Sequence, residues 1–299
     1  MIKTSVLILS SKTYPSVKNS KVQKKLFLKT RNEEIFWYKQ GTNKQLKNKK
    51  TNLILNDLYV PSSDDSLSMG YKTLDAFEWM LKNSEFEYLF RTNTSSYFSL
   101  QNLNEFIIKN LINSEFVYSG LIQETKDFEN NLVVFASGSG YILNRKTVQL
   151  IVENKELWNH DYWDDVSLAL ILKKFNIEPQ IGKRFDIRGN PFRQNIDVSN
   201  YHFRCRIDNH YGYPRVLETQ VLKFLDKKIN NLEENKIKKS ILDVIFELFK
   251  LLYVHQFAWK IFLIARSILK KFLPKIVYNF FKKIFKKQIT KFKLVRFKT

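Results

Sequence analysis

The sequence contains a single cysteine, Cys205, among its 299 residues, so no disulfide can form within the chain. Scarce cysteine is typical of a reducing compartment, and we therefore expect a cytoplasmic protein. Cys205 stands between Arg204 and Arg206 without the other signals of a reactive thiol, and we interpret it as incidental.

Long hydrophobic runs are also missing. No window approaches the roughly 18 apolar residues that a membrane-spanning helix needs. Within residues 236–299, the longest stretch without Asp, Glu, Lys or Arg covers residues 251–259. The apolar run at residues 6–9 is too short for a secretory signal, because polar residues follow it directly. We expect at most peripheral attachment to a membrane, on its inner, cytoplasmic face.

Acidic residues are scarce towards the end of the chain. Residues 236–299 carry 17 Lys and Arg against 2 Asp and Glu, a net charge of +15, which leaves +6 of the total +21 for residues 1–235. The cations alternate with blocks of aromatic and aliphatic side chains, a pattern typical of helices on anionic membranes. Nucleic acid is the less favoured partner, and a packed helical subdomain with a basic face is the structural alternative. We predict a domain over residues 1–215 and a basic amphipathic helical tail over 216–299.

Short β-rich runs alternate with helical patterns in the first half of the chain. We expect strands at residues 5–10, 34–38, 52–55, 87–90 and 115–118, and helices at 17–29, 68–81 and 103–111. This alternation predicts an α/β domain with a mainly parallel sheet flanked by helices, whereas residues 182–214 show little periodicity. Ligands bind beyond the carboxyl ends of such strands, so residues 10–14 and 91–96 are candidate site loops.

The sequence has no phosphate-binding loop with Gly-Lys-Ser/Thr and no GxGxxG motif. It does have Ser137-Gly138-Ser139-Gly140, whose glycines would let the backbone approach a sugar or phosphate closely, although a hairpin turn or bulge is the alternative. Further along, Asp164 and Asp165 form a carboxylate pair at a predicted helix start. One of them is a candidate base for a hydroxyl group, and helix capping is the alternative.

A group of cations follows the carboxylate pair. Guanidinium groups bind phosphates bidentately, so this group is a candidate phosphate site, with a solvated basic surface as the alternative. His202 is the only candidate metal ligand in it and has no partner ligand nearby in the sequence. The cations are Lys183, Arg184, Arg188, Arg193, Arg204 and Arg206.

Taken in order, these segments resemble the β-1,3-glycosyltransferase and fringe group of GT-A fold enzymes. Residues 69–79 resemble the helix that precedes the group's nucleotide-sugar motif, and residues 86–98 occupy the place of that motif. Residues 136–143 resemble its glycine segment, and residues 163–166 resemble its Glu-Asp segment. The resemblance spans about residues 3–206 and implies a GT-A, Rossmann-like fold.

The resemblance implies an inverting glycosyltransferase that moves a sugar from a nucleoside-diphosphate sugar, a UDP-sugar, to a hydroxyl of a glycan or lipid-linked acceptor. It makes Asp165 the general base and Asp164 its orienting partner. The implied donor-binding residues are Ser10, Ser11, Tyr14, Lys72, Arg91, Asn93, Thr94 and Ser95. The implied sugar or acceptor contacts are Gly138, Ser139, Gly140 and Trp163, and the implied diphosphate contacts are Lys183, Arg184, His202 and Arg204.

One departure from the family pattern concerns the metal. Where the family has Asp-x-Asp, residues 91–96 read Arg-Thr-Asn-Thr-Ser-Ser and contain no carboxylate. Hard cations prefer charged oxygen ligands, so the sequence argues against Mn or Mg as a cofactor. The charge on the leaving diphosphate still needs a partner, and the cations at 183–206 are candidates for it. The departure also leaves open an inactive sugar- or membrane-binding protein on a transferase scaffold.

Overall fold

The computed structural model describes residues 2–28, 34–65, 68–207, 213, 215–230 and 241–248. The compact unit that contains the sheet ends at Asp243. Most of the predicted membrane-binding tail therefore lies outside the described residues. None of the helices in the described part is long and apolar enough to cross a bilayer.

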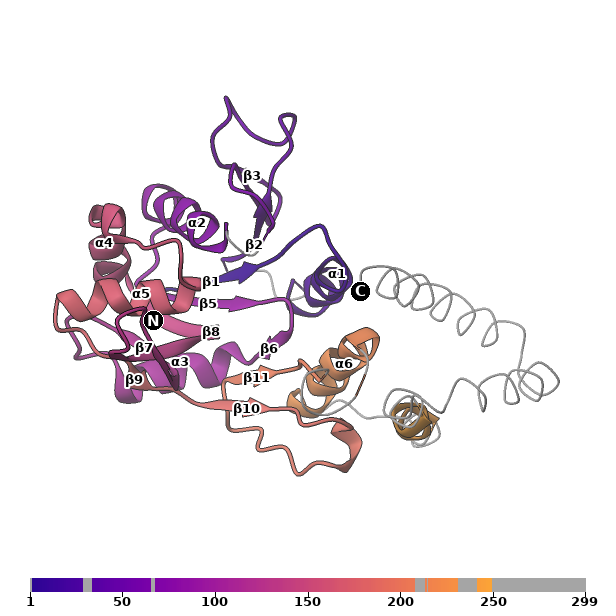
Figure 1. Cartoon of the computed structure of the whole chain (residues 1–299). Helices are drawn as coiled ribbons and strands as arrows, with labels where there is room; N and C mark the ends of the chain where they lie inside the picture. Colours follow the sequence, from indigo (N-terminus) through magenta and orange to yellow (C-terminus); the bar gives the residue numbers. More distant parts are fainter. Residues whose placement is uncertain are drawn as a thin grey trace, which may run out of the picture. The chain divides into compact units, whose positions relative to one another are not determined.

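A mixed eight-stranded sheet, in the order β3-β4-β2-β1-β5-β8-β7-β9, forms the centre of this unit (Figure 1). Strands β4, β2, β1 and β5 are parallel, whereas β3 and β8 join this group antiparallel. The apolar run at residues 6–8 is fully buried, which is why β1 takes a central position. The strands are β1 (Thr4–Leu9), β2 (Ile35–Gln40), β3 (Asn52–Ile54), β4 (Asp57–Val60), β5 (Tyr88–Asn93), β7 (Tyr118–Lys126), β8 (Leu132–Asn144) and β9 (Gln180–Ile181).

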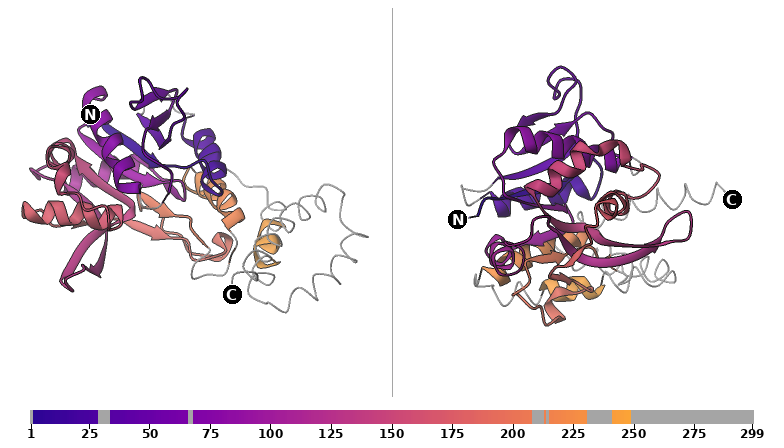
Figure 2. Two further views of the ribbon diagram at one scale, coloured as in Figure 1. Left: turned by 45° about the horizontal axis from the view of Figure 1, so that its top comes forward. Right: turned by 90° about the vertical axis from the view of Figure 1, so that its left-hand side faces the viewer.

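Helices cover the sheet and confirm the α/β prediction. Helices α2, α4 and α5 pack against one another, and α1 packs against α6; Figure 2 shows the same groups from two further sides. Leu74 and Phe77 of α2 are buried, as the helical pattern predicts. The helices are α1 (Ser16–Phe27), α2 (Met69–Asn83), α3 (Leu100–Asn110), α4 (Arg145–Glu153), α5 (Asp164–Lys174) and α6 (Glu218–Ile229), with short 3-10 turns η1 (Lys155–Leu157), η2 (Pro191–Arg193) and η3 (Arg215–Leu217).

A second, three-stranded sheet joins distant parts of the chain. Its order is β10 (Arg184–Asp186), β11 (His202–Arg204) and β6 (Ser96–Phe98). The region that shows little periodicity in the sequence thus contributes two strands, and β11 runs antiparallel to β6 with His202 opposite Phe98. This pairing places the basic segment beside the turn that follows β5.

The first helix of the predicted tail belongs to the compact unit. Helix α6 packs on α1, and Glu218 Oε2 accepts a hydrogen bond from Asn19 Nδ2 at 2.6 Å. At its other end, Asp226 accepts one from the Tyr97 hydroxyl at 3.2 Å. The compact unit therefore extends past the boundary expected at residue 215.

The glycine segment lies inside β8 rather than at a hairpin turn. On one side β5 pairs with it, with Thr92 opposite Gly140. On the other side Ile122 pairs with Ala136 and Gly120 with Tyr141, so residues 137–140 bulge away from β7. The bulge interpretation is confirmed, and the hairpin alternative is wrong.

Candidate active site

The two predicted site loops meet at the carboxyl ends of β1 and β5. The Thr94 N–H donates to the Leu9 carbonyl at 3.2 Å, and the Thr94 hydroxyl donates to Ser16 Oγ at 3.1 Å. Ser16 Oγ also accepts a hydrogen bond from the Ser11 N–H at 2.8 Å. The loop after β1 and the turn after β5 are therefore one connected surface, as the parallel strand order predicts.

The remaining side chains of the β1 loop differ in exposure. Ser10 is buried, with its hydroxyl 3.4 Å from Ser16 Oγ, whereas 44% of Tyr14 is exposed. Burial and the carboxylate of Glu218 raise the pKa of the Tyr14 hydroxyl, and Arg215 opposes this rise. Tyr14 thus keeps a neutral, partly exposed hydroxyl beside these two charged groups.

The carboxylate pair occupies the first turn of α5. The residue before the helix, Trp163, forms the N-cap position without a side-chain hydrogen bond, so the interpretation of Asp164 as the N-cap is wrong. Asp164 is 5% exposed and accepts hydrogen bonds from Arg91 Nη2 and from the Thr73 hydroxyl, the latter at 3.3 Å. Asp164 is therefore committed to the protein interior, while 61% of Trp163 is exposed beside it.

Arg91 is buried, donates hydrogen bonds to three parts of the protein and does not face the predicted site of the sugar donor. Only 1% of it is exposed. Its Nε donates to the Tyr38 hydroxyl at 2.9 Å, its Nη1 to the Gly138 carbonyl and its Nη2 to Asp164. The Tyr141 ring covers the guanidinium, with 5.3 Å from Cζ to the ring centroid. The donor contact predicted for Arg91 is inconsistent with this burial, and its role is to fix Asp164 against the glycine segment.

Asp165, unlike Asp164, is partly exposed. Its Oδ2 accepts a hydrogen bond from the Gly138 N–H at 2.6 Å. Burial and the neighbouring charge of Asp164 raise its pKa to about 6, although the Gly138 N–H and Arg91 oppose the rise. A carboxylate of this kind binds a proton more readily than an ordinary aspartate and still ionises near neutral pH, which suits a general base.

At both glycines of the segment, a side chain of this chain occupies the space where a Cβ would lie. A Cβ at Gly138 would lie 2.8 Å from Asp165 Oδ2, and a Cβ at Gly140 would lie 2.5 Å from His202 Cε1. The close approach expected from the sequence therefore occurs, but with side chains of this chain. Ser139, also predicted to contact sugar, has its hydroxyl bonded to Arg184 Nη1.

Two of the residues predicted to bind the diphosphate, Arg184 and His202, already have partners within the protein. Arg184 pairs with Asp186, at 2.7 Å between Nε and Oδ1, and burial lowers its pKa against the effect of that carboxylate. His202 is 1% exposed, and its Nε2 lies 3.0 Å from Ser96 Oγ. Burial and the charges of Arg184 and Arg204 hold its pKa well below the usual range, so the ring is neutral and fits a structural role better than diphosphate binding. Lys183 is exposed and Arg204 is half-buried.

The residues that replace the acidic motif do not suit a divalent cation. Asn93 Oδ1 accepts a hydrogen bond from the Ser95 N–H at 2.9 Å, and the Ser95 hydroxyl donates to Glu218 Oε2 at 2.9 Å. With Thr94 bonded to Ser16, each polar side chain of the turn already serves the fold. Within the part of the chain that the structure describes, no three His, Cys, Asp or Glu side chains converge on a common point. Cys205 is buried, in line with an incidental thiol.

Lys72 lies at the predicted donor site with an unexpected partner. Its Nζ is 3.0 Å from Asp64 Oδ1 and 3.3 Å from the Ser10 carbonyl. Asp64 also accepts the backbone N–H groups of Lys12 and Gln40, at 2.9 and 3.0 Å. Burial alone would raise the pKa of Asp64, but these donors and the charge of Lys72 hold it below the usual range. The sequence analysis does not single out Asp64, because no local pattern in the sequence indicates its contact with Lys72.

The comparisons with known proteins come from sequence and from structure. A family model described as Galactosyltransferase matches residues 40–182, which include Lys72, Gly138 and Asp165. No curated protein sequence matches the chain. A glycosyltransferase involved in the glycosylation of the major capsid of PBCV-1 has 8% identity and a TM-score of 0.42, over 74% of this chain and 99% of that one. A 4-diphosphocytidyl-2C-methyl-D-erythritol synthase from Anaerococcus prevotii has 11% identity and a TM-score of 0.39, over 60% and 86%.

Proposed function

Because residues 40–182 place this chain in the galactosyltransferase family, a family of hexosyltransferases, we propose that it is an inverting glycosyltransferase with Asp165 as its general base. The donor is a nucleoside-diphosphate sugar, and the acceptor is a hydroxyl of a glycan or glycolipid. The observation that carries the proposal is the contrast within the carboxylate pair. Asp164 is buried against Arg91, whereas Asp165 is partly exposed with a pKa near 6.

In the proposed reaction, Asp165 takes the proton of the acceptor hydroxyl. The acceptor oxygen then forms a bond to the anomeric carbon as the bond between that carbon and the diphosphate oxygen breaks. The electron pair of the broken bond leaves with the diphosphate, and attack from the opposite face inverts the anomeric centre. The Gly138 N–H holds Asp165 in position for this step, and the exposed Trp163 offers a ring face to a sugar.

A screen of UDP-, GDP- and dTDP-sugars tests this function. The full chain is expected to hydrolyse or transfer the sugar of one donor, at a rate that a chelator does not change, because the turn at residues 93–95 does not suit a metal. Turnover with none of the donors would support the alternative of an inactive binding protein on a transferase scaffold. The nucleic-acid alternative predicts a gel shift that depends on the tail.

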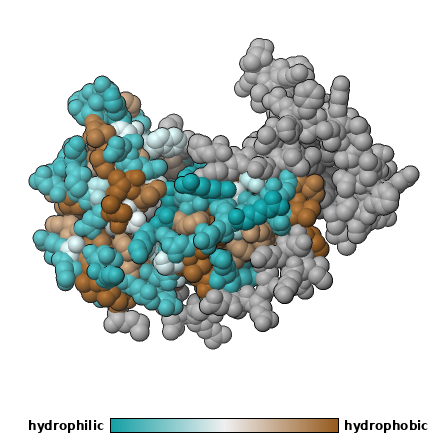
Figure 3. All heavy atoms as spheres, turned by 90° about the horizontal axis from the view of Figure 1, so that it is seen from below, coloured by the Kyte–Doolittle hydropathy of each residue, from teal (hydrophilic) through white to brown (hydrophobic). Residues whose placement is uncertain are grey.

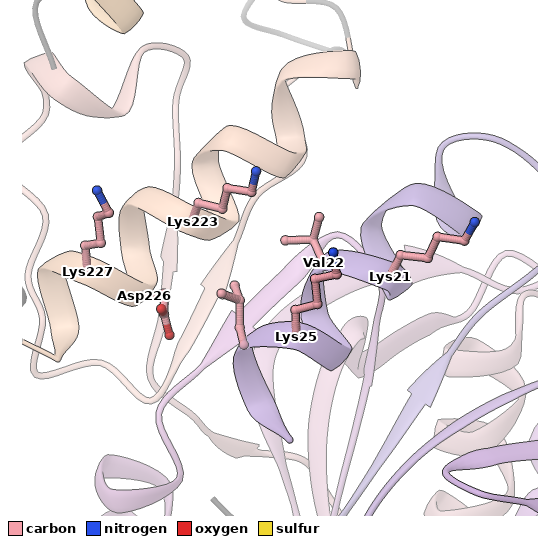
Figure 4. A pocket seen from close by; sticks show the side chains of 7 residues that line it. Lys21, Val22, Lys25, Lys223, Asp226 and Lys227 are labelled. Carbon is pink, nitrogen blue, oxygen red and sulfur yellow. The ribbon is translucent and has the colours of Figure 1, made fainter. Parts of the chain in front are cut away.

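We further propose that the chain attaches peripherally to an anionic membrane, on the cytoplasmic face, through residues 236–299. The net charge of +15 in this segment supports the proposal. The folded unit adds a groove between α1 and α6, whose lining includes Lys21 and Lys25 of α1 and Lys223, Asp226 and Lys227 of α6 (Figure 4). The face seen in Figure 3 is mainly hydrophilic, with small separate hydrophobic areas.

A further inference from the structure

The turn that lacks the acidic motif is in contact with an arginine from a distant part of the chain. Arg215 Nη2 donates to the Ser95 hydroxyl at 2.8 Å. Ser95 belongs to the segment at residues 91–96, which by its resemblance stands where the family has Asp-x-Asp. We propose that Arg215 takes the place of that metal ion and binds the diphosphate of the donor, an inference that rests on the glycosyltransferase function proposed above.

Glu218 fixes the orientation of this guanidinium. Arg215 Nε and Nη2 donate to the two oxygens of Glu218, at 2.6 and 3.2 Å. Glu218 itself is 0% exposed and also accepts hydrogen bonds from Asn19 at 2.6 Å and from Ser95 at 2.9 Å. A guanidinium that is already held in one plane loses little side-chain entropy when it binds an anion.

The exposure of the two charged groups differs. The Arg215 side chain is 28% exposed, whereas the Glu218 side chain is 0% exposed. Glu218 offsets the charge of the pair, and the part of the pair that solvent reaches is the guanidinium and not the carboxylate. The pair therefore presents a local positive charge to the loops around it.

Arg215 also lies beside the other donor loop. In the β1 loop, Glu218 raises the pKa of the Tyr14 hydroxyl and Arg215 lowers it. The β1 loop and the turn after β5 are themselves joined through Thr94 and Ser16. Arg215 thus stands where these loops meet, and both flank the predicted donor diphosphate.

Other cations near the site are less suited to this role. The side chains of Arg91 and Arg184, which pair with Asp164 and Asp186, are only 1% and 3% exposed. Lys72 is 2% exposed and paired with Asp64. Arg215 combines partial exposure with direct contact to the turn that replaces the acidic motif, so it is the better candidate for the charge that stabilises the leaving group.

The test is calorimetric binding of UDP and UMP to the full chain in the presence of EDTA. Arg215→Ala is expected to weaken UDP binding about tenfold or more and to change UMP binding much less, because UMP lacks the second phosphate. Arg215→Lys is expected to retain part of the UDP affinity. Lys109→Ala, the loss of an exposed cation near the end of α3, is the control and is expected to bind UDP like the wild type.

Removing Arg215 alone leaves a buried carboxylate without its cation, so Arg215→Ala combined with Glu218→Gln serves as a second variant, and circular dichroism confirms that both are folded. UDP affinity that is unchanged in the folded variants overturns this inference, and so does wild-type UDP binding that EDTA abolishes. A wild-type chain that neither binds UDP nor transfers sugar from any donor contradicts the proposed function itself.

Discussion

The Gly138 N–H and the Asp165 carboxylate are joined by a hydrogen bond of 2.6 Å that links the bulged part of β8 to the first turn of α5. The Gly138 carbonyl is bonded to Arg91, whose guanidinium also binds Asp164. One peptide segment thus positions both members of the carboxylate pair, one through its donor and one through its acceptor. The bulge opposite β7 is the local geometry that makes this double contact available.

Asp165→Asn is expected to abolish sugar transfer and to leave the protein folded, because asparagine accepts the Gly138 hydrogen bond but cannot take a proton from an acceptor hydroxyl. Transfer is measured with the donor found in the screen, and Asp161→Asn, an exposed aspartate, is the control. Near-native transfer by Asp165→Asn would rule out this residue as the base.

The same variant is expected to be more stable than the wild type at pH 7. The pKa of Asp165 is raised from 3.8 to about 6 in the folded state, so ionisation of this group opposes folding as the pH rises through that interval. Asparagine removes this effect and is expected to add about 1–3 kcal/mol to the free energy of unfolding at pH 7. The gain should vanish near pH 4, which urea unfolding at the two pH values checks.

Catalysis is expected to increase with pH through about 6, since Asp165 must be ionised to act as a base. The profile of kcat/KM against pH in the free enzyme gives this pKa directly. A value of kcat/KM that does not change between pH 5 and 7 would contradict the assignment of Asp165 as the base.

Gly138→Ala is expected to displace Asp165, because the new Cβ would lie 2.8 Å from Oδ2. We expect at least a tenfold loss of kcat, since a small misplacement of a catalytic group reduces the rate strongly. The matched control is Gly41→Ala, whose Cβ would also be too close to a neighbour, but to the flexible end of Leu46 and outside the candidate site. Equal activity of the two variants would show that the contact at Gly138 is not needed.

Arg91→Met is expected to destabilise the fold by about 3–5 kcal/mol, because it leaves Asp164 buried without its cation. Lys155→Ala, which removes a solvent-exposed pair with Glu78, is the control and is expected to cost less than about 1 kcal/mol. Thermal unfolding of the two variants measures the contrast. Similar losses of stability in the two variants would mean that the buried contacts of Arg91 contribute no more than an exposed ion pair.

Deleting residues 244–299, beyond the end of the compact unit, is expected to abolish flotation with phosphatidylserine vesicles, whereas the full chain floats and is released by high salt. Neutral phosphatidylcholine vesicles are the control. If the shortened protein still floats, the lysines between α1 and α6 bind the membrane and the role proposed for the tail is wrong.

The sequence predicts strands β1, β2, β3 and β5 of the large sheet, whereas the strand expected at residues 115–118 begins only at Tyr118. It does not predict which partners the buried polar residues have. The apolar run of β1 and the helical pattern of α2 are strong local signals, and both elements are confirmed. Strands β4 and β6 have no such signal, since β6 begins in a polar stretch and is recognised only by its pairing with β11. Local periodicity carries no information about such long-range pairing.

In the candidate site, too, the sequence predicts some residues but not the long-range contacts that they make. Asp165 and Gly138 are predicted by order and spacing along the chain. The burial of Arg91 is not, because an arginine is ordinarily exposed and its partners come from three separate strands and helices. The contact of Ser95 with Glu218 depends on how α6 docks, which no local pattern encodes.

The docking of α6 has a consequence for the order in which the protein matures. Until Glu218 has been synthesised and has docked, the amide of Asn19 and the hydroxyl of Ser95 lack the buried acceptor that they share. A nascent chain that has completed only the central sheet therefore has its donor loops in place without their final support. The enzyme proposed here would acquire activity only after Glu218 has been synthesised and has docked.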